Sequence, residues 1–563
     1  MNSETKNCQN CKSEFTIEPD DFAFYEMMKV PPPTWCPRCR LIRRMAWRGY
    51  QKLHKRKCDS TGEQVISVIH PNAPYRVYRQ DIWWSDKWDP KSYGKDYDFS
   101  KSFFVQFEEL LKQVPLPALF TEYTTMVDSD YCNAAATLRN CYLCFNADTS
   151  ENCAYLNTIE GMKECFDVSF ANFNELCYQS VNINKCYKTF YSVDCEECQD
   201  VYFSRDCIGC TNCVGCVGLR KKSYHILNQP YTKEEYEKVL AQYDFGSRKS
   251  VTDFRIKADA FALKFPRKAF RGRKNERSSG DCLWNCKNVR DSYMVTNGEN
   301  VRYSQLLKAG PVANAYDYTT FAMNAEQIYE CCWVGIQVNN IKFGFWDYKS
   351  HDLEYSFGCH GSGNLFGCIG VRGAEYCILN KQYSKEEYVD LVTRIKKQMA
   401  EVPYQDKKGR EYRYGEYFPS ELSPWAYNET NVMDWFPISK AEALAQGFLW
   451  RNPDVREYLP ATAGLPDHIR DAEDGILKEI FQCTACGKNY RVISMELDFY
   501  RHFQIPIPAK CSFCRDNERR VQLNPIAFYD RICAKCSEAI KTTYAPDRPE
   551  IVYCEQCYQA EVA

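Results

Sequence analysis

The chain has 563 residues, with 72 Lys and Arg against 74 Asp and Glu, so its formal net charge is −2. This length exceeds what one hydrophobic core supports, and several domains are expected. The balanced charge excludes binding to nucleic acid or membranes through the overall field of the protein, which leaves only local patches. The sequence has no apolar run long enough to span a bilayer, and its start, MNSETKNCQN, lacks the features of a signal peptide.

Cysteine usage points to metal binding. The 33 cysteines are an odd number, and many of them form C-x2-C pairs. In a chain without a secretion signal, such pairs indicate metal ligands rather than a disulfide framework. We therefore expect a cytoplasmic protein with no membrane partner, and its oligomeric state stays open.

The first predicted element is a small metal-binding module at residues 1–82. Two C-x2-C knuckles there offer four thiolates, and the C-terminal region repeats their spacing in one register, so that Cys8 matches Cys483 and Cys39 matches Cys514. Four thiolates around one ion leave no open position for water, so each set predicts a structural Zn²⁺ rather than a catalytic one. The two sets are Cys8, Cys11, Cys36 and Cys39, and Cys483, Cys486, Cys511 and Cys514.

The repeat continues beyond these cysteines and explains the isolated Cys58. Its C-terminal counterpart, Cys533, begins a third set that continues with Cys536, Cys554 and Cys557. The N-terminal positions that match those last three cysteines are Thr61, Arg79 and Ile82. The sequence thus predicts three zinc ions in all and a lost fourth site, in which Cys58 is a small buried residue. A reactive thiol is the less favoured interpretation.

Both ends resemble a family of zinc-ribbon domains found in many bacterial proteins. The resemblance covers about 35 residues at each end and rests on the knuckles, an aromatic pair, a P-x-P step and an arginine after the last cysteine. The layout of the whole chain also resembles long cysteine-rich hypothetical proteins of uncultured bacteria with reduced genomes. These resemblances imply zinc binding and no established activity. The matching residues are Cys8, Cys11, Phe15, Phe24, Tyr25, Cys36, Cys39 and Arg40, and Cys483, Cys486, Tyr490, Phe499, Tyr500, Cys511, Cys514 and Arg515.

A basic run, RLIRRMAWRGYQKLHKRK at residues 40–57, follows the last N-terminal knuckle directly. Basic side chains neutralise phosphates and aromatic rings offer stacking faces, so this run is a candidate surface for RNA or DNA. Solvated charge without a ligand is the equally weighted alternative. The candidate residues are Arg40, Arg43, Arg44, Trp47, Arg48, Lys52, Lys55, Arg56 and Lys57.

The next elements are an amphipathic helix at 98–114 and a cysteine-rich repeat. Apolar residues of the helix lie on one face, which predicts docking on a solenoid. Cysteines then recur at intervals of 12 and 9 from Cys141 to Cys207, beside aromatic and small apolar residues. This pattern predicts a parallel β-helix or solenoid with about two segments per coil and an inward ladder of cysteines.

A second copy of the repeat follows. Residues 212–236 match residues 364–388 at 14 of 25 positions. Each copy ends in a capping box, Thr232-x-x-Glu235 or Ser384-x-x-Glu387, which predicts a helix after each solenoid. The fold class expected is mainly β and multidomain, with terminal zinc-ribbon modules flanking two duplicated β-solenoids with capping helices.

The solenoid cysteines admit three interpretations. Cys207, Cys210, Cys213 and Cys216 have spacings close to those of an iron–sulfur run but lack its x3 gap and closing Cys-Pro. In the second copy two of the four positions are Ser362 and Leu365, and a leucine in place of a thiol is typical of a core. An inert core is favoured, and zinc or an iron–sulfur cluster at these four cysteines is the alternative.

The expected domains follow from these elements. They are a ribbon module with a degenerate second site (1–82), a connector (83–118), a first solenoid with its terminal helix (119–245), a basic linker (246–280), a second solenoid with its helix (281–400), a connector (401–480) ending in a helix near 469–481, and a double ribbon (481–563).

Three functions remain open on the sequence. The first is a non-enzymatic zinc protein that contacts RNA or DNA through the basic run. The second is a scaffold that binds a protein partner on the solenoid face. The third is an enzyme acting in a solenoid groove, although the sequence contains no common catalytic motif and no catalytic residue is predicted.

Overall fold

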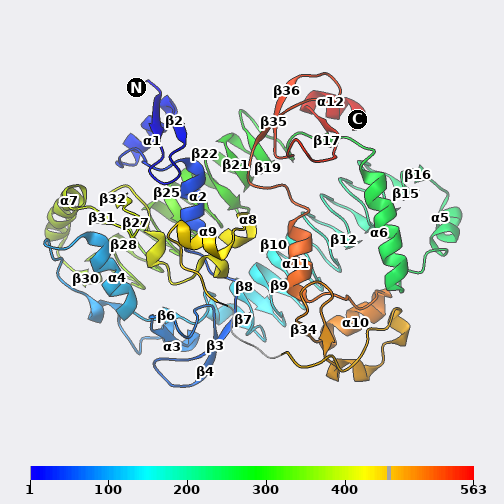
Figure 1. Ribbon diagram of the computed structural model, residues 1–563, viewed down its shortest axis with the longest axis horizontal. Coiled ribbons are helices and arrows are strands. Elements are labelled where there is room, and N and C mark those ends of the chain that lie inside the picture. The colour runs from blue at the N-terminus through cyan, green and yellow to red at the C-terminus, as the bar shows by residue number, and fades with distance from the viewer. Residues whose placement is uncertain (1, 453–457, 563) are drawn as a thin grey trace. The chain divides into compact units, whose positions relative to one another are not determined.

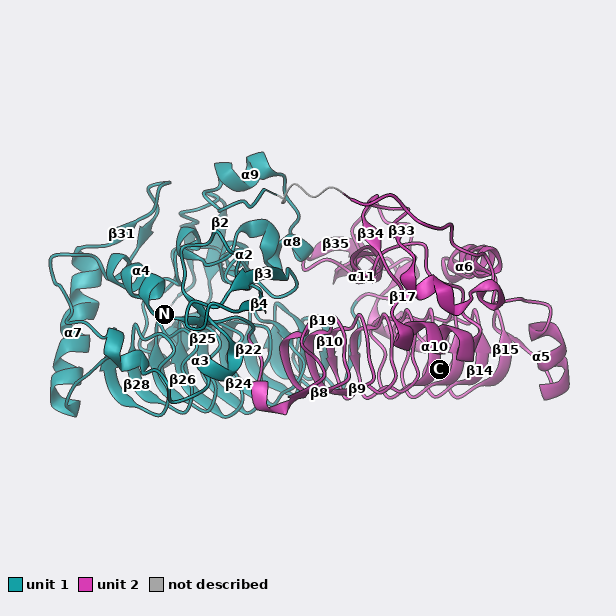
Figure 2. Ribbon diagram, turned by 90° about the horizontal axis from the view of Figure 1, so that it is seen from below, with its two compact units in different colours: residues 1–119, 270–452 teal, residues 120–269, 453–563 magenta. Residues whose placement is uncertain are grey.

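The computed structural model describes residues 2–452 and 458–562. The chain forms two compact units, coloured separately in Figure 2: unit 1 contains residues 1–119 and 270–452, and unit 2 contains residues 120–269 and 453–563. Each unit therefore combines one end of the chain with the solenoid that lies farther from that end in the sequence. The expected mainly β fold with two solenoids is confirmed, whereas this pairing of ends with solenoids was not predicted.

Each coil of the solenoid in unit 2 contains 12 residues, so hydrogen-bonded partners on successive coils are 12 positions apart in the sequence. Parallel pairs join Asn157 to Ser169 and, by isolated bridges, Tyr142 to Ala154 and Ala154 to Phe166. The predicted two segments per coil were wrong, because each segment is a complete coil. The strands are β7 (Met126–Val127), β8 (Asn133–Arg139), β9 (Phe145–Glu151), β10 (Asn157–Glu160), β11 (Ser169–Asn172), β12 (Tyr187–Phe190), β13 (Gln199–Tyr202), β14 (Thr211–Val214), β15 (Ser223–Ile226) and β16 (Gln229–Pro230).

A short repeating unit builds each side of a coil. Every third residue from Asn140 to Leu227 has a left-handed backbone. The residue after most of these bends points inward, which is why the inward cysteines of this solenoid are spaced by multiples of three. Asn, Asp and Gly adopt the left-handed conformation most readily, and they precede many of the inward cysteines, as in Asn140-Cys141 and Gly209-Cys210.

The solenoid of unit 1 follows the same plan with insertions. The coil spacing rises to 14 between Gly298 and Val312 and to 13 between Val312 and Ala325, and it then returns to 12. Its strands are β18 (Gly272–Arg273), β19 (Gly280–Trp284), β20 (Lys287–Arg290), β21 (Ser292–Thr296), β22 (Gly298–Arg302), β23 (Gln305–Leu307), β24 (Val312–Thr319), β25 (Ala325–Cys332), β26 (Val338–Lys342), β27 (His351–Glu354), β28 (Gly363–Phe366), β29 (Glu375–Ile378) and β30 (Lys381–Gln382).

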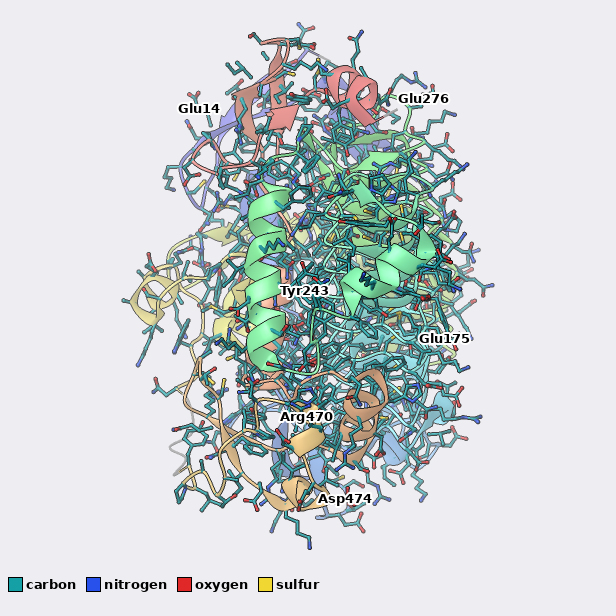
Figure 3. The ribbon with its side chains drawn as sticks, turned by 90° about the vertical axis from the view of Figure 1, so that its right-hand side faces the viewer. Glu14, Glu175, Tyr243, Glu276, Arg470 and Asp474 are labelled. Carbon is teal, nitrogen blue, oxygen red and sulfur yellow. The ribbon has the colours of Figure 1, made fainter. Side chains whose placement is uncertain are left out.

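Helices cover one end and one flank of each solenoid. Helices α5 (Lys233–Leu240) and α7 (Lys385–Glu401) follow the last coils, and both predicted capping boxes are formed. Helix α4 (Phe103–Gln113), predicted from its apolar face, packs on the solenoid of unit 1, where Phe103 lies 5.0 Å from Tyr355 between ring centroids. Helix α6 (Arg248–Ala262) packs on the solenoid of unit 2, where Phe254 lies 5.0 Å from Phe203 between ring centroids. Tyr243, labelled near α6 in Figure 3, packs edge to face on Phe254 at 4.9 Å.

The ribbon modules have the same order of elements in both units (Figure 1), and helix α12 of the C-terminal module begins at the position that matches the start of the shorter α3 (Gln80–Trp83). The hairpin that carries Cys58 and the hairpin that carries Cys533 begin and end at matching positions of the repeat. In the N-terminal module lie β1 (Glu4–Asn7), β2 (Glu14–Ile17), α1 (Pro19–Met27), α2 (Pro37–Met45), β3 (His54–Lys57), β4 (Gln64–Ser67) and β5 (Val77–Tyr78). In the C-terminal module lie β33 (Phe481–Gln482), β34 (Asn489–Tyr490), α10 (Ser494–Phe503), α11 (Ser512–Arg520), β35 (Tyr529–Ile532), β36 (Ala539–Thr542), β37 (Val552–Tyr553) and α12 (Glu555–Val562).

The connectors hold short elements. Strand β6 (Leu116–Pro117) pairs with β5, and β17 (Arg267–Lys268) pairs with β37 in the same way. The others are α3 (Gln80–Trp83), η1 (Pro90–Tyr93), η2 (Tyr123–Thr125), β31 (Tyr404–Gln405), β32 (Glu411–Tyr412), η3 (Ser420–Leu422), η4 (Tyr427–Glu429), α8 (Val432–Trp435), α9 (Lys440–Ala445), η5 (Ile469–Asp471) and η6 (Asp474–Lys478).

Two expectations about connectors need correction. The region 246–280, expected as a linker, contains helix α6, because Val251, Phe254, Ala258 and Ala262 form one buried face. The helix expected near 469–481 is replaced by two short 3₁₀ turns. None of the helices in the described part of the chain has both the length and the apolar character needed to cross a bilayer.

Candidate metal centres and the interface they support

The first predicted cysteine set comes together in the N-terminal ribbon. The four sulfur atoms of Cys8, Cys11, Cys36 and Cys39 all lie within 4.8 Å of one another. The backbone N–H of Cys36 donates to Cys8 Sγ at 3.2 Å, and the side-chain amide of Asn10 donates to Cys39 Sγ at 3.2 Å. Donors aimed at sulfur stabilise thiolates, so this set fits a metal ion held by four of them.

The two C-terminal sets have the same geometry. In each, the sulfur atoms again lie within 4.8 Å, and a backbone N–H donates to the first cysteine, from Cys511 to Cys483 and from Cys554 to Cys533. The pKa of Cys483 is lowered to about 6, because backbone N–H groups that donate to its sulfur outweigh the opposing effect of burial. All twelve predicted ligands are thus brought together in three groups: those of the N-terminal ribbon, Cys483, Cys486, Cys511 and Cys514, and Cys533, Cys536, Cys554 and Cys557.

The hairpin around Cys58 keeps its fold without a cysteine set. The backbone N–H of Arg79 donates to Cys58 Sγ at 3.2 Å, as Cys554 does to Cys533. The Arg79 guanidinium forms ion pairs with Glu63 and Asp81 where the C-terminal copy has a ligand. Cys58 is 1% exposed, which agrees with its predicted role as a small buried residue.

Each ribbon leads into a helix that carries arginines into the interior. In unit 1, α2 begins after Cys36, and Arg40 and Arg44 converge on Asp317 at the solenoid surface. Arg40 Nη2 lies 2.8 Å from Asp317 Oδ2, and Arg44 Nη1 lies 2.9 Å from Asp317 Oδ1. The Arg40 guanidinium also lies 5.3 Å from the ring centre of Tyr303, one coil earlier. We call this arrangement the arginine clamp.

Unit 2 contains the same clamp. Arg515 and Arg519 on α11 converge on Asp167, with Arg515 Nε 2.9 Å from Oδ2 and Arg519 Nη1 2.8 Å from Oδ1. The Arg515 guanidinium lies 4.9 Å from the ring centre of Tyr155, again one coil earlier. The duplication therefore extends from the metal ligands to the contact between ribbon and solenoid.

Further carboxylates and aromatic rings complete the interface. Arg43 bridges two buried acids, with Glu330 Oε1 at 3.0 Å and Glu416 Oε2 at 2.8 Å. Burial raises the pKa of Glu330 despite the cations beside it, whereas Asp317 holds the pKa of Arg40 above its ordinary value against the effect of burial. In both units the aromatic pair of the ribbon also packs on the solenoid, through Phe24 on Tyr316 at 3.8 Å and Phe499 on Phe166 at 4.6 Å.

This interface corrects the expected basic surface. Arg40, Arg43, Arg44, Arg48 and Trp47 are each at most 1% exposed, so they are interior residues of unit 1 and present no surface to RNA or DNA. A carboxylate partner was not visible in the sequence, because Asp317 and Asp167 are far from the arginines along the chain. Arg56 is also buried and pairs with Asp59, which leaves Lys52, Lys55 and Lys57 on the surface.

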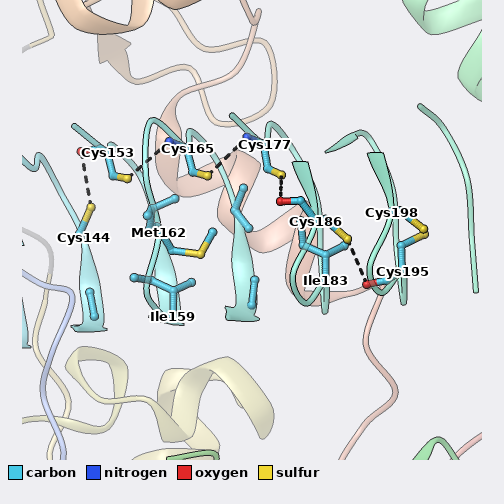
Figure 4. Packing of buried hydrophobic residues seen from close by; sticks show 14 of the residues in the cluster. Cys144, Cys153, Ile159, Met162, Cys165, Cys177, Ile183, Cys186, Cys195 and Cys198 are labelled. Carbon is cyan, nitrogen blue, oxygen red and sulfur yellow. Dashed lines mark hydrogen bonds between the residues drawn. The ribbon is translucent and has the colours of Figure 1, made fainter. Parts of the chain in front are cut away.

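The cysteines of the first solenoid form an inward ladder, part of which Figure 4 shows. Their thiols lie within hydrogen-bonding distance of backbone carbonyls, as Cys177 Sγ does at 3.4 Å from the oxygen of Glu175. At an equivalent inward position, the Ser180 hydroxyl donates to the carbonyl oxygen of Tyr178 at 3.0 Å. Cys207, Cys210, Cys213 and Cys216 occupy the four inward corners of one coil, but their sulfur atoms do not form a compact group like the three sets above.

A groove of about 480 Å³ runs across the longer coils of the second solenoid. Glu326 is the single carboxylate among the described residues that line it, so the pair of acids used by glycosidases is not present there. His351 reaches this groove, whereas His360 packs among Trp84 and Trp346, so the described His351, Cys359 and His360 do not form a metal group.

Comparison with known proteins gave no match. No family model matches the chain, and no match was found among curated proteins or solved structures. The resemblance of the two ends to zinc ribbons therefore rests on the sequence motifs given above and on the three cysteine groups.

Proposed function

We propose that this protein is a non-enzymatic scaffold whose ribbons are fixed by three structural zinc ions and whose solenoids bind a macromolecular partner. The observation that carries the proposal is the arginine clamp. In each unit the helix that starts at the second knuckle of the metal set also carries the two arginines that join ribbon to solenoid. Metal binding thereby supports an internal contact rather than an exposed ligand site.

Zinc is the ion we favour in all three groups. Four thiolates in a closed tetrahedron suit Zn²⁺ and leave no position for a substrate. A small ribbon has little core of its own, so the binding energy of the metal contributes to its folding. Iron held by four thiolates has the same ligand set and is the alternative that metal analysis must separate.

The clamp argues against RNA or DNA as the partner of the basic run. The arginines that would supply phosphate contacts have carboxylate partners in the interior, and breaking a buried ion pair is costly. Lys52, Lys55 and Lys57 remain exposed but supply only three positive charges. A protein partner is therefore the form of the proposal that the contacts favour.

Metal analysis and hydrogen exchange test the proposal together. We expect three zinc ions and no iron per chain by elemental mass spectrometry. Chelation should then increase amide exchange in α2 and α11 and in the strands beside them, because the clamps lose their rigid base. Unchanged exchange after complete metal removal would show that the ions do not support the interface.

A further inference from the structure

The two units repeat each other closely enough to compare them residue by residue. Phe103 of α4 packs 5.0 Å from Tyr355, and Phe254 of α6 packs 5.0 Å from Phe203 in the same relation. Beside them, a Cβ on Gly367 would lie 2.8 Å from Phe103, and one on Gly215 would lie 3.3 Å from Phe254. Near these contacts the matching residues are Phe103 and Phe254 in the helices, Gly367 and Gly215 in the last coils of the solenoids, and Arg40 and Arg515 in the ribbons.

In unit 1 a connector segment fills the space between these three elements. Phe418 is fully buried there, and its ring lies 4.9 Å from Trp47 of the ribbon and 4.8 Å from Phe107 of α4. Phe104 at 6.4 Å and Tyr355 at 5.9 Å complete its surroundings. The segment around Phe418, residues 414–428, is therefore a peptide that occupies a site built by ribbon, helix and solenoid.

In unit 2 the corresponding place is a pocket. The residues that match the four neighbours of Phe418 are Gln522, Ala258, Arg255 and Phe203, and all four line this pocket. Trp47 and Phe107 are thus replaced by smaller side chains, which leaves a pocket of about 20 Å³ where Phe418 lies in unit 1.

The surface beside the pocket is also uncovered. In unit 1, Ser423 of the connector donates to the carbonyl of Ala46 at 2.9 Å, and Ala46 is 3% exposed. The matching residue in unit 2, Val521, is 76% exposed. The missing cover therefore extends from the pocket onto the end of α11.

The charge of the pocket differs from that of its counterpart. Arg255 replaces Phe104 and Arg205 replaces Phe357, and both arginines line the pocket and are partly exposed. Within the described residues neither guanidinium has an ion-pair partner within 4.0 Å. Asp259 is the single carboxylate among the described lining residues, so the arginines leave the pocket with a net positive charge.

An aromatic floor completes the pocket. The rings of Tyr191 and Phe203 stack there at 4.6 Å between centroids. Two guanidinium groups and an aromatic floor that line one pocket suit a carboxylate that is attached to a chain with apolar neighbours.

We propose that this pocket of unit 2 docks an acidic peptide segment of a partner protein, in the place that residues 414–428 take in unit 1. A carboxylate side chain of the segment lies between Arg205 and Arg255, and apolar residues beside it cover Val521. This inference deepens the scaffold proposal and rests on it, because it assigns a binding site to the partner.

The test uses the zinc-loaded full chain and a fluorescent peptide of residues 414–428 in which Phe418→Glu places a carboxylate at the filling position. Anisotropy should show binding, and the variant R205E/R255E should weaken it at least about tenfold. A258F/Q522W, which restores bulk found in unit 1, should block the pocket without changing its charge. A peptide with Phe418→Lys should bind at least about tenfold more weakly than the Glu peptide.

Matched controls separate this site from general charge effects. K238E/K249E changes the charge of unit 2 by the same amount at exposed positions outside the pocket and should leave binding unchanged. Binding by both pocket variants equal to that of the wild type, or no binding of the Glu peptide by a chain with three zinc ions, would overturn the pocket. The scaffold proposal fails separately, through unchanged hydrogen exchange on metal removal.

Discussion

The buried carboxyl group of Asp347 predicts a measurable pH dependence of the protein's stability. Its carboxyl is buried in unit 1, where it accepts hydrogen bonds from the N–H of Cys359 at 2.8 Å and from the Ser356 hydroxyl at 2.7 Å. Burial raises the pKa of Asp347 to about 7. Asn174 makes the equivalent bond in the other solenoid, accepting from Cys186 N–H at 2.8 Å. We therefore expect D347N to fit the site.

The sign of the pH effect follows from the raised pKa. The folded protein holds the proton of Asp347 up to about pH 7, whereas the unfolded chain releases it near 3.8. The stabilising contribution of Asp347 is therefore fully present below its unfolded pKa and is lost as the pH rises through about 7. One pKa unit corresponds to about 1.4 kcal/mol, so the total loss is on the order of 4 kcal/mol, of which about 2 kcal/mol falls between pH 5.5 and 8.

Urea unfolding of wild type and D347N at pH 5.5 and pH 8 measures this effect. The advantage of D347N should grow by about 2 kcal/mol between the two pH values, because the amide does not titrate. D390N, on the exposed surface of α7, serves as the control for removal of one charge. A difference between D347N and wild type that does not change with pH would refute the argument.

Three further predictions concern the ribbons. R44A and R519A should each reduce the free energy of unfolding by about 3–5 kcal/mol, since each leaves a buried aspartate with one cation fewer. A loss below about 1 kcal/mol for both variants in urea unfolding would contradict the clamp. K52A, at an exposed position, is the control. T61C/R79C/I82C should raise the zinc content from three ions to four by elemental analysis, with Cys58 as the remaining ligand. Adding C58S should abolish the gain. A triple variant that gains no zinc would show that the hairpin has lost the geometry of a four-cysteine site. If RNA binds through the basic run, the logarithm of the binding constant should fall with the logarithm of the salt concentration with a slope no steeper than about −3, because only three lysines of the run are exposed. A slope near −5 that K52E/K55E/K57E does not remove would mean that the buried arginines become accessible.

The sequence by itself determined the local patterns. The C-x2-C spacing identified all twelve residues of the three metal groups, because ligands of one knuckle are neighbours along the chain. The capping boxes located the starts of α5 and α7, since a cap is formed by residues three positions apart. The cysteine intervals indicated a solenoid, whereas only the structure shows that their common factor of three marks the sides of a coil.

Only the tertiary structure decided what the charges do. A run of basic residues looks the same in a sequence whether it faces solvent or a buried carboxylate. Asp317 lies 273 residues from Arg44, and Asp167 lies 352 residues from Arg519, so neither clamp could be found from local spacing. The pocket of unit 2 depends likewise on three segments that meet only in space. Burial and long-range pairing, which a linear pattern does not contain, thus separate an interior clamp from a binding surface.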